Sequence, residues 1–84
     1  MSCPQIQFQN VSRAQFTCLQ QAAGQQLNLV ISGDNGSASD ASGNNTITWN
    51  YDEAGSVLTL QAVKTTYLCF LVEQKLKSFV GSCP

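Results

Sequence analysis

The chain has 84 residues, of which 11% are charged and none is histidine, and its formal net charge is −1. A chain of this length forms one small domain. The charge balance offers no basic stripe for nucleic acid and no polybasic cluster for anionic lipid, so we expect neither a nucleic-acid nor a membrane partner. The absence of histidine excludes every mechanism that needs an imidazole base or ligand.

The chain is rich in hydrophobic and uncharged polar residues. Hydrophobic residues make up 43% of the chain, enough for a core, and the polar remainder is mostly Gln, Asn, Ser and Thr. A surface with so few charges has little repulsion to keep copies apart, which favours self-association. No apolar run reaches the ~18 residues that span a bilayer. The first ten residues, MSCPQIQFQN, lack the basic and apolar regions of a secretory signal, so we expect a cytoplasmic protein unless a signal has been removed.

The chain begins with a short alternating segment. In residues 5–9, Ile6 and Phe8 alternate with glutamines. This period of two predicts either a short edge strand or an extended arm.

Residues 12–23 predict a helix. Ser12 and Gln15 have the spacing of a capping box, in which the serine side chain accepts a hydrogen bond from the backbone three residues on. Gly24 is a natural helix stop. The apolar face of this helix consists of Phe16, Leu19, Ala22 and Ala23.

Three alternating segments follow, at residues 27–32, 46–51 and 57–63. Each has the pattern of an antiparallel strand with one buried and one solvated face. Short connections favour sequential neighbours, so the three strands predict a meander. The residues expected on the buried side are Leu27, Leu29, Ile31, Ile47, Trp49, Tyr51, Leu58, Leu60 and Ala62.

The connection at residues 33–45 consists of Gly, Asp, Asn, Ser and Ala. It has no large apolar side chain whose burial would offset the entropy of ordering it. We therefore expect a mobile polar loop.

Residues 66–80 predict the last helix, capped by Thr65 or Thr66 and ended by Gly81. Its core-facing stripe consists of Leu68, Cys69, Val72, Leu76, Phe79 and Val80. Together these elements predict a single domain, residues 1–84, of the α+β class. We expect a two-layer arrangement in which two helices pack on one face of the three-stranded meander, with a fourth edge strand if residues 5–9 pair. The chain order is (β)αβββα.

The four cysteines, Cys3, Cys18, Cys69 and Cys83, contain no CxxC pair, so neither a zinc ribbon nor a thioredoxin-type redox centre is predicted. Cys18 and Cys69 lie on or beside apolar helix faces, where free cysteine packs as a small hydrophobe. Cys3 and Cys83 lie near the two ends, and a disulfide between them requires an oxidising setting. The pairing remains open at this point.

No catalytic motif is present, and we expect a non-enzyme without cofactor or metal. A cysteine nucleophile needs a neighbouring base or cation, and none is placed by a motif. The segment from Asp34 to Asn45 has acidic and amide side chains but not the spacing of a calcium-binding EF-hand: Ser39 replaces the required glycine.

The most informative feature is the start of the last helix. Tyr67, Phe70 and Leu71 point away from the core-facing stripe, so the helix begins apolar on nearly every side. A helix that is apolar all round is normally covered all round. Three kinds of cover are possible. The first is another part of the same chain, either the arm with Ile6 and Phe8 or the first helix. The second is a partner chain such as a second copy, and the third is a small apolar ligand. The leading hypothesis is a protein-interaction or assembly module that self-associates through this face.

An alternative hypothesis is a carrier of a small apolar ligand bound between the helices and the sheet, at Trp49, Phe16 and Leu60. Its mark is a cavity of at least ~300 Å³ beside the tryptophan. The outer sheet face is predicted to be flat, uncharged and solvated, without an aromatic platform for sugars. Its residues are Asn28, Ser32, Thr46, Thr48, Asn50, Thr59 and Gln61.

Overall fold

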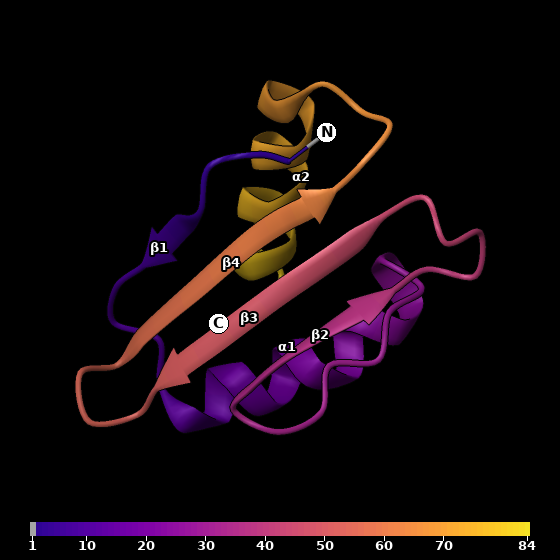
Figure 1. Ribbon diagram of the computed structural model, residues 1–84. Coiled ribbons are helices and arrows are strands. Elements are labelled where there is room, and N and C mark those ends of the chain that lie inside the picture. The colour runs from indigo at the N-terminus through magenta and orange to yellow at the C-terminus, as the bar shows by residue number, and fades with distance from the viewer. Residues whose placement is uncertain (1) are drawn as a thin grey trace.

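A computed structural model describes residues 2–84 and contains a four-stranded antiparallel sheet with two helices against one face (Figure 1). The sheet order is β1-β4-β3-β2. This confirms the α+β class and the order (β)αβββα, with the fourth strand present. The elements are β1 (Ile6–Phe8), α1 (Arg13–Gln26), β2 (Asn35–Ser39), β3 (Thr46–Asp52), β4 (Val57–Lys64) and α2 (Cys69–Gly81).

The core lies between the sheet and the two helices. Every second residue along β3 and β4 is buried, as the alternation predicts, and Trp49 lies directly opposite Leu60 in the register. The single-sided burial explains why these segments form strands and why the other face stays polar. The buried residues that the helices contribute are Phe16, Leu19 and Ala23 from α1 and Leu76, Phe79 and Val80 from α2.

Strand β1 pairs with β4 at one edge of the sheet. Ile6 lies opposite Leu60 and Phe8 opposite Leu58, so both apolar side chains of the segment face the core. Of the two interpretations of residues 5–9, the edge strand is therefore the observed one.

The strand predicted at residues 27–32 is wrong. Leu29 and Ile31 are buried and Val30 is 77% exposed, so the alternation of burial is real, but the segment is not part of the sheet. Asn28 has a positive φ of 54°, and the backbone amides of Leu27 and Leu29 both donate to the carbonyl of Ala23. These contacts bind the segment to the end of α1 and keep it from pairing with β3.

The strand next to β3 is instead β2, which lies inside the segment expected to be a structureless loop. Asn35 to Ser39 pair with Asn50 to Thr46 of β3. A Cβ atom at Gly36 would lie 3.0 Å from Cζ2 of Trp49, so the missing side chain lets the strand approach the indole. The indole Nε1 also donates to the carbonyl of Gly33, at 3.2 Å. Backbone pairing and this close approach order the strand, whose only apolar side chain is the small Ala38 at the edge of the core.

Helix α1 begins as predicted and ends later. Ser12 is the N-cap, and its Oγ accepts a hydrogen bond from the Gln15 amide at 3.1 Å. The expected stop at Gly24 is wrong, because the helix continues to Gln26. The turn out of the helix is made by Leu27 and the left-handed Asn28.

Helix α2 begins three residues later than predicted, at Cys69, with Leu68 as an N-cap that has no side-chain hydrogen bond. The expected caps at Thr65 or Thr66 are therefore wrong: the Thr65 hydroxyl accepts from the Tyr67 amide and shapes the loop before the helix. Because Leu68 precedes the helix, it does not join the core-facing stripe and is exposed. Leu76, Phe79 and Val80 are buried as expected.

Two disulfides join the elements: Cys3–Cys69 and Cys18–Cys83, with Cα atoms 5.5 and 6.0 Å apart. The expectation that Cys18 and Cys69 are free core residues is wrong. The pairing that the sequence left open is neither Cys3 with Cys83 nor Cys18 with Cys69. The first bond ties the segment before β1 to the start of α2, and the second ties α1 to the C-terminal end.

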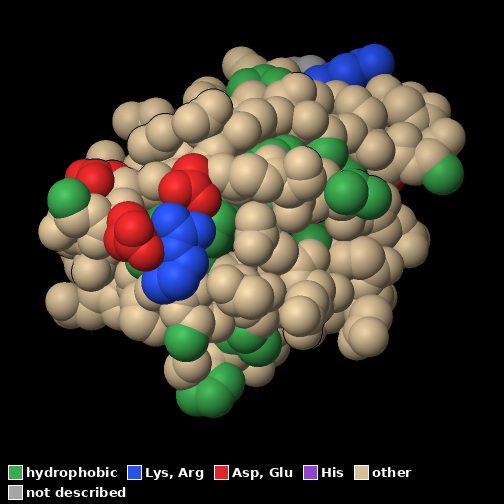
Figure 2. Space-filling model, turned by 90° about the horizontal axis from the view of Figure 1, so that it is seen from below, with side chains coloured by type: hydrophobic (Ala, Val, Ile, Leu, Met, Phe, Trp, Pro, Cys, Tyr) green, Lys and Arg blue, Asp and Glu red, His purple; other side chains and the backbone are tan. Residues whose placement is uncertain are grey.

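Charged side chains are few, and Figure 2 shows the largest acidic and basic group at one end of the face that it views. Arg13 forms a bidentate pair with Asp34, at 2.7 and 2.8 Å, and its Nε donates to Glu53 at 2.8 Å. The guanidinium also lies 5.0 Å from the ring centroid of Tyr51. This cluster joins the start of α1 to β2 and to the β3–β4 hairpin.

Candidate functional site

Four large apolar side chains are exposed together where α2 begins. Tyr67, Leu68, Phe70 and Leu71 have exposed fractions of 58%, 55%, 57% and 45%. We call these four residues the α2 apolar surface. No charged residue interrupts the sequence between Lys64 and Glu73. Exposed large apolar side chains that gather at one place in the fold favour an interaction site more than singly scattered ones do.

The local sequence explains the exposure. Val72 and Leu76 face the sheet, so the residues on the other sides of the first turn point outward. Ile6 and Phe8 lie against β4, where they pair and pack, and neither they nor α1 cover the α2 apolar surface. Cover from within the described chain, one of the three possibilities left open by the sequence, is therefore not the observed one.

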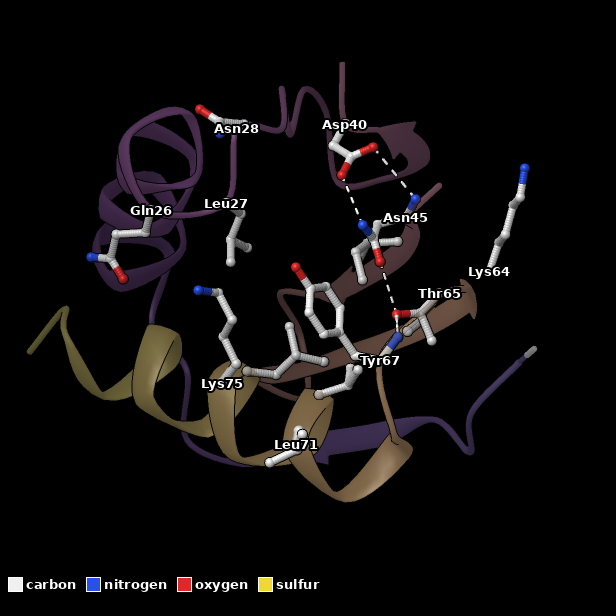
Figure 3. A pocket seen from close by; sticks show the side chains of 14 residues that line it. Gln26, Leu27, Asn28, Asp40, Asn45, Lys64, Thr65, Tyr67, Leu71 and Lys75 are labelled. Atoms are coloured by element: carbon white, nitrogen blue, oxygen red, sulfur yellow. Dashed lines mark hydrogen bonds between the residues drawn. The ribbon is translucent and has the colours of Figure 1, made fainter. Parts of the chain in front are cut away.

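The loop before α2 is held by a chain of hydrogen bonds (Figure 3). The Tyr67 amide donates to Oγ1 of Thr65 at 3.1 Å, and that hydroxyl donates to Oδ1 of Asn45 at 2.8 Å. The Asn45 side-chain amide in turn donates to Asp40 at 2.8 Å. This series of hydrogen bonds fixes the β2–β3 connection to the loop that precedes α2.

Asp40 is the acidic end of this network. It also accepts a hydrogen bond from the Ser42 hydroxyl at 2.7 Å. The hydrogen bonds from Asn45 and Ser42 lower the pKa of Asp40 below its ordinary value, because they stabilise the ionised carboxylate. Its oxygens are thus occupied by partners from its own connection.

A half-open groove of about 340 Å³ lies beside the α2 apolar surface, between the end of α1, the β2–β3 connection and α2. Its apolar lining consists of Leu27, Ile47, Ala62, Tyr67, Leu71, Val72 and Leu76. A volume of this size lies at the lower end of the range for small-molecule sites.

A second, smaller hollow of about 220 Å³ lies on the other side of α2. It is lined by the segment before β1 and by Phe70 and Glu73 of the helix. The exposed first turns of α2 therefore form a ridge with a hollow on each side.

The cations of the chain are distributed unevenly around these features. Among residues 2–84, Arg13 and Lys77 form ion pairs, whereas Lys64 and Lys75 form none. Both unpaired lysines line the larger groove. In Figure 3 the Lys75 side chain extends from α2 toward Leu27, and that of Lys64 points away from the other labelled groups.

The residues assigned to the alternative ligand hypothesis do not line this groove. Phe16, Trp49 and Leu60 are buried in the core, and Phe16 stacks on Tyr51 with ring centroids 4.5 Å apart. They hold the helices and the sheet together, and the groove of about 340 Å³ is lined by other residues.

The open face of the sheet is polar, as predicted, but its residues differ in part. Asn28 and Ser32 lie outside the sheet, and β2 supplies Asn35, Ser37 and Ser39 instead. Side chains in neighbouring strands form hydroxyl and amide rows, and Ser39 and Thr46 are hydrogen-bonded at 2.7 Å.

Sequence reasoning identified three of the four residues of the α2 apolar surface. It missed Leu68, because the helix was placed too early. It also missed the groove residues Asn45, Thr65 and Lys75, which come from three separate segments. Asn45 and Thr65 are hydrogen-bonded and Lys75 has no ion pair only because of how those segments are arranged in space.

Among residues 2–84, no helix has the length and apolar character to cross a membrane, and no three acidic or cysteine side chains cluster as a metal ion requires. No family model, no curated protein and no solved structure matches this chain.

Proposed function

We propose that this protein is a non-catalytic interaction module that associates with a second copy of itself through the α2 apolar surface. The observation that carries the proposal is the exposure of Tyr67, Leu68, Phe70 and Leu71 in one uncharged stretch of chain. Interface cores are enriched in aromatic residues and depleted of charged ones, and this surface has that composition.

The surface is also held in shape before any partner binds. The Cys3–Cys69 disulfide fixes the first residue of α2, and the hydrogen bond from the Tyr67 amide to Thr65 fixes the loop before it. A surface that is ordered in the free protein loses little conformational entropy on binding. Association therefore retains more of the free energy that apolar burial provides.

A second copy is the partner favoured by charge and shape. The net charge of −1 gives two copies little mutual repulsion. In a two-fold dimer both copies contribute the same surface, so each copy offers a hollow in which the ridge of the other can pack. The smaller hollow beside Phe70 gives the partner's apolar side chains a recess.

The two disulfides support a role in an oxidising compartment, where such bonds form and persist, rather than in the cytoplasm.

Sedimentation velocity over a concentration series tests the proposal. We expect a reversible monomer–dimer equilibrium, and we expect Phe70→Ser to weaken it about tenfold or more, because aromatic residues at interface centres contribute most of the affinity. Val30→Ser is the matched control, since Val30 is exposed but far from α2 in the chain and outside both hollows. A strictly monomeric wild type, or equal effects of the two variants, would overturn the proposal.

A further inference from the structure

We infer that the larger groove is a binding site for a single-chain anionic amphiphile, a molecule with an apolar chain and a negatively charged head. This site goes beyond self-association: it shares Tyr67 and Leu71 with the α2 apolar surface, but most of its lining comes from residues outside that surface.

The lining of the groove selects for an apolar chain. Ile47, Ala62 and Leu76 are buried residues that line the groove, and the partly buried Leu27 and Val72 complete its apolar lining. The volume of about 340 Å³ accommodates a small ligand, and the half-open shape leaves one end for a head group in water.

The charges of the rim select for an anion. Lys64 and Lys75 are the two cations without an ion pair among residues 2–84, and both belong to this rim. The acidic residue of the rim, Asp40, directs its oxygens to Ser42 and Asn45. The lining therefore has two lysine charges and one carboxylate charge, and the net positive charge favours an anionic ligand.

Lys75 is the group that we assign to the head. Its side chain extends from α2 toward Leu27, whereas that of Lys64 points away from the other labelled groups (Figure 3). Tyr67, an exposed residue, lines the same groove, and its hydroxyl is a second donor for a carboxylate. The expected ligand thus lays its chain on the apolar lining and places its anionic head between Lys75 and Tyr67.

Isothermal titration calorimetry on the oxidised full chain tests this inference with three probes, all below micelle formation. Dodecanoate has the chain and the anionic head, dodecyltrimethylammonium has the chain with a cationic head, and acetate has the head alone. We expect one dodecanoate per chain, weaker binding of the cationic probe, and no measurable binding of acetate.

Variants identify the site. Lys75→Gln is expected to weaken dodecanoate binding about three- to fivefold, the range for a partly exposed ion pair. Lys77→Gln removes the same charge from the same helix outside the groove, and it should leave the affinity unchanged. Phe70 does not line the groove, so Phe70→Ser should leave the affinity of the monomer unchanged when it is measured at protein concentrations too low for dimer formation.

Three results would overturn the inference: equal affinity for the anionic and cationic probes, equal effects of Lys75→Gln and Lys77→Gln, or no binding of dodecanoate at all.

Discussion

Gly36 lies directly against the indole of Trp49, so closely that a methyl group at the glycine would meet the ring at 3.0 Å. The indole itself is held by the hydrogen bond from Nε1 to the Gly33 carbonyl. This contact between an edge strand without a large apolar side chain and a buried aromatic ring orders one side of the sheet. It makes Gly36 a structural requirement.

Gly36→Ala is therefore expected to destabilise the protein by about 1 kcal/mol or more, the cost of overpacking beside a ring that cannot move freely. Gly24→Ala is the matched control. A Cβ at Gly24 meets nothing within 4 Å, and alanine in a helix interior should stabilise by about 0.5–1 kcal/mol. Urea unfolding of both variants measures the difference, and similar effects of the two would contradict this packing.

The Tyr51 hydroxyl is buried and donates to the Val11 carbonyl at 2.7 Å. Tyr51→Phe leaves that carbonyl without its partner, and we expect a loss of about 1–2 kcal/mol in the free energy of unfolding. Tyr67→Phe, which removes an exposed hydroxyl, should have no measurable effect on stability. Chemical denaturation decides whether the two substitutions differ in this way.

The disulfides are expected to be the largest single contributions to stability. They close chain separations of 66 and 65 residues, and the chain-entropy model assigns about 4 kcal/mol to a loop of that length. Replacing both cysteines of either pair with alanine should therefore lower the melting temperature strongly and by similar amounts. A melting temperature that is the same with and without reductant would show that the bonds contribute little.

Acid should destabilise the fold through two carboxylates. The hydrogen bonds and the charge of Arg13 lower the pKa of Asp34, and hydrogen bonds from Asn45 and Ser42 lower the pKa of Asp40, both from an ordinary value of 3.8. A lowered pKa in the folded state means that the stabilisation is complete above the ordinary value and is lost as the pH falls through the folded one. We expect the urea concentration at half-unfolding to decrease as the pH is lowered below about 4. The decrease should be smaller in Asp34→Asn than in the wild type. An unchanged midpoint down to about pH 2 would contradict these pairings.

The fold could be predicted from the sequence where apolar side chains alternate or recur at helical spacing. Trp49 and Leu60 were placed on the buried side of the sheet, and Ser12 at the start of a helix, because local patterns determine both. Strand β2 could not be predicted in this way. Its ordering comes from backbone pairing with β3 and from the indole beneath Gly36, and neither is visible in the composition of the segment.

The same distinction applies to the site. Tyr67, Phe70 and Leu71 were expected to point outward because their spacing relative to the buried stripe is a local signal, although Tyr67 lies in the loop before α2. The disulfide pairing was not predicted, because the spacing of cysteines does not determine which of them meet in space. The groove needs the end of α1, the first two turns of α2, the sheet and the β2–β3 connection to converge, which only the folded arrangement shows.

The most direct test of the self-association claim is the concentration dependence of backbone amide resonances in NMR spectra of the oxidised protein. On dilution, we expect the amides of residues 67–71 to shift progressively, while those of Thr48 and Gln61 on the open sheet face stay constant. Spectra that do not change with concentration, or shifts confined to the sheet face, would contradict an interface at the start of α2.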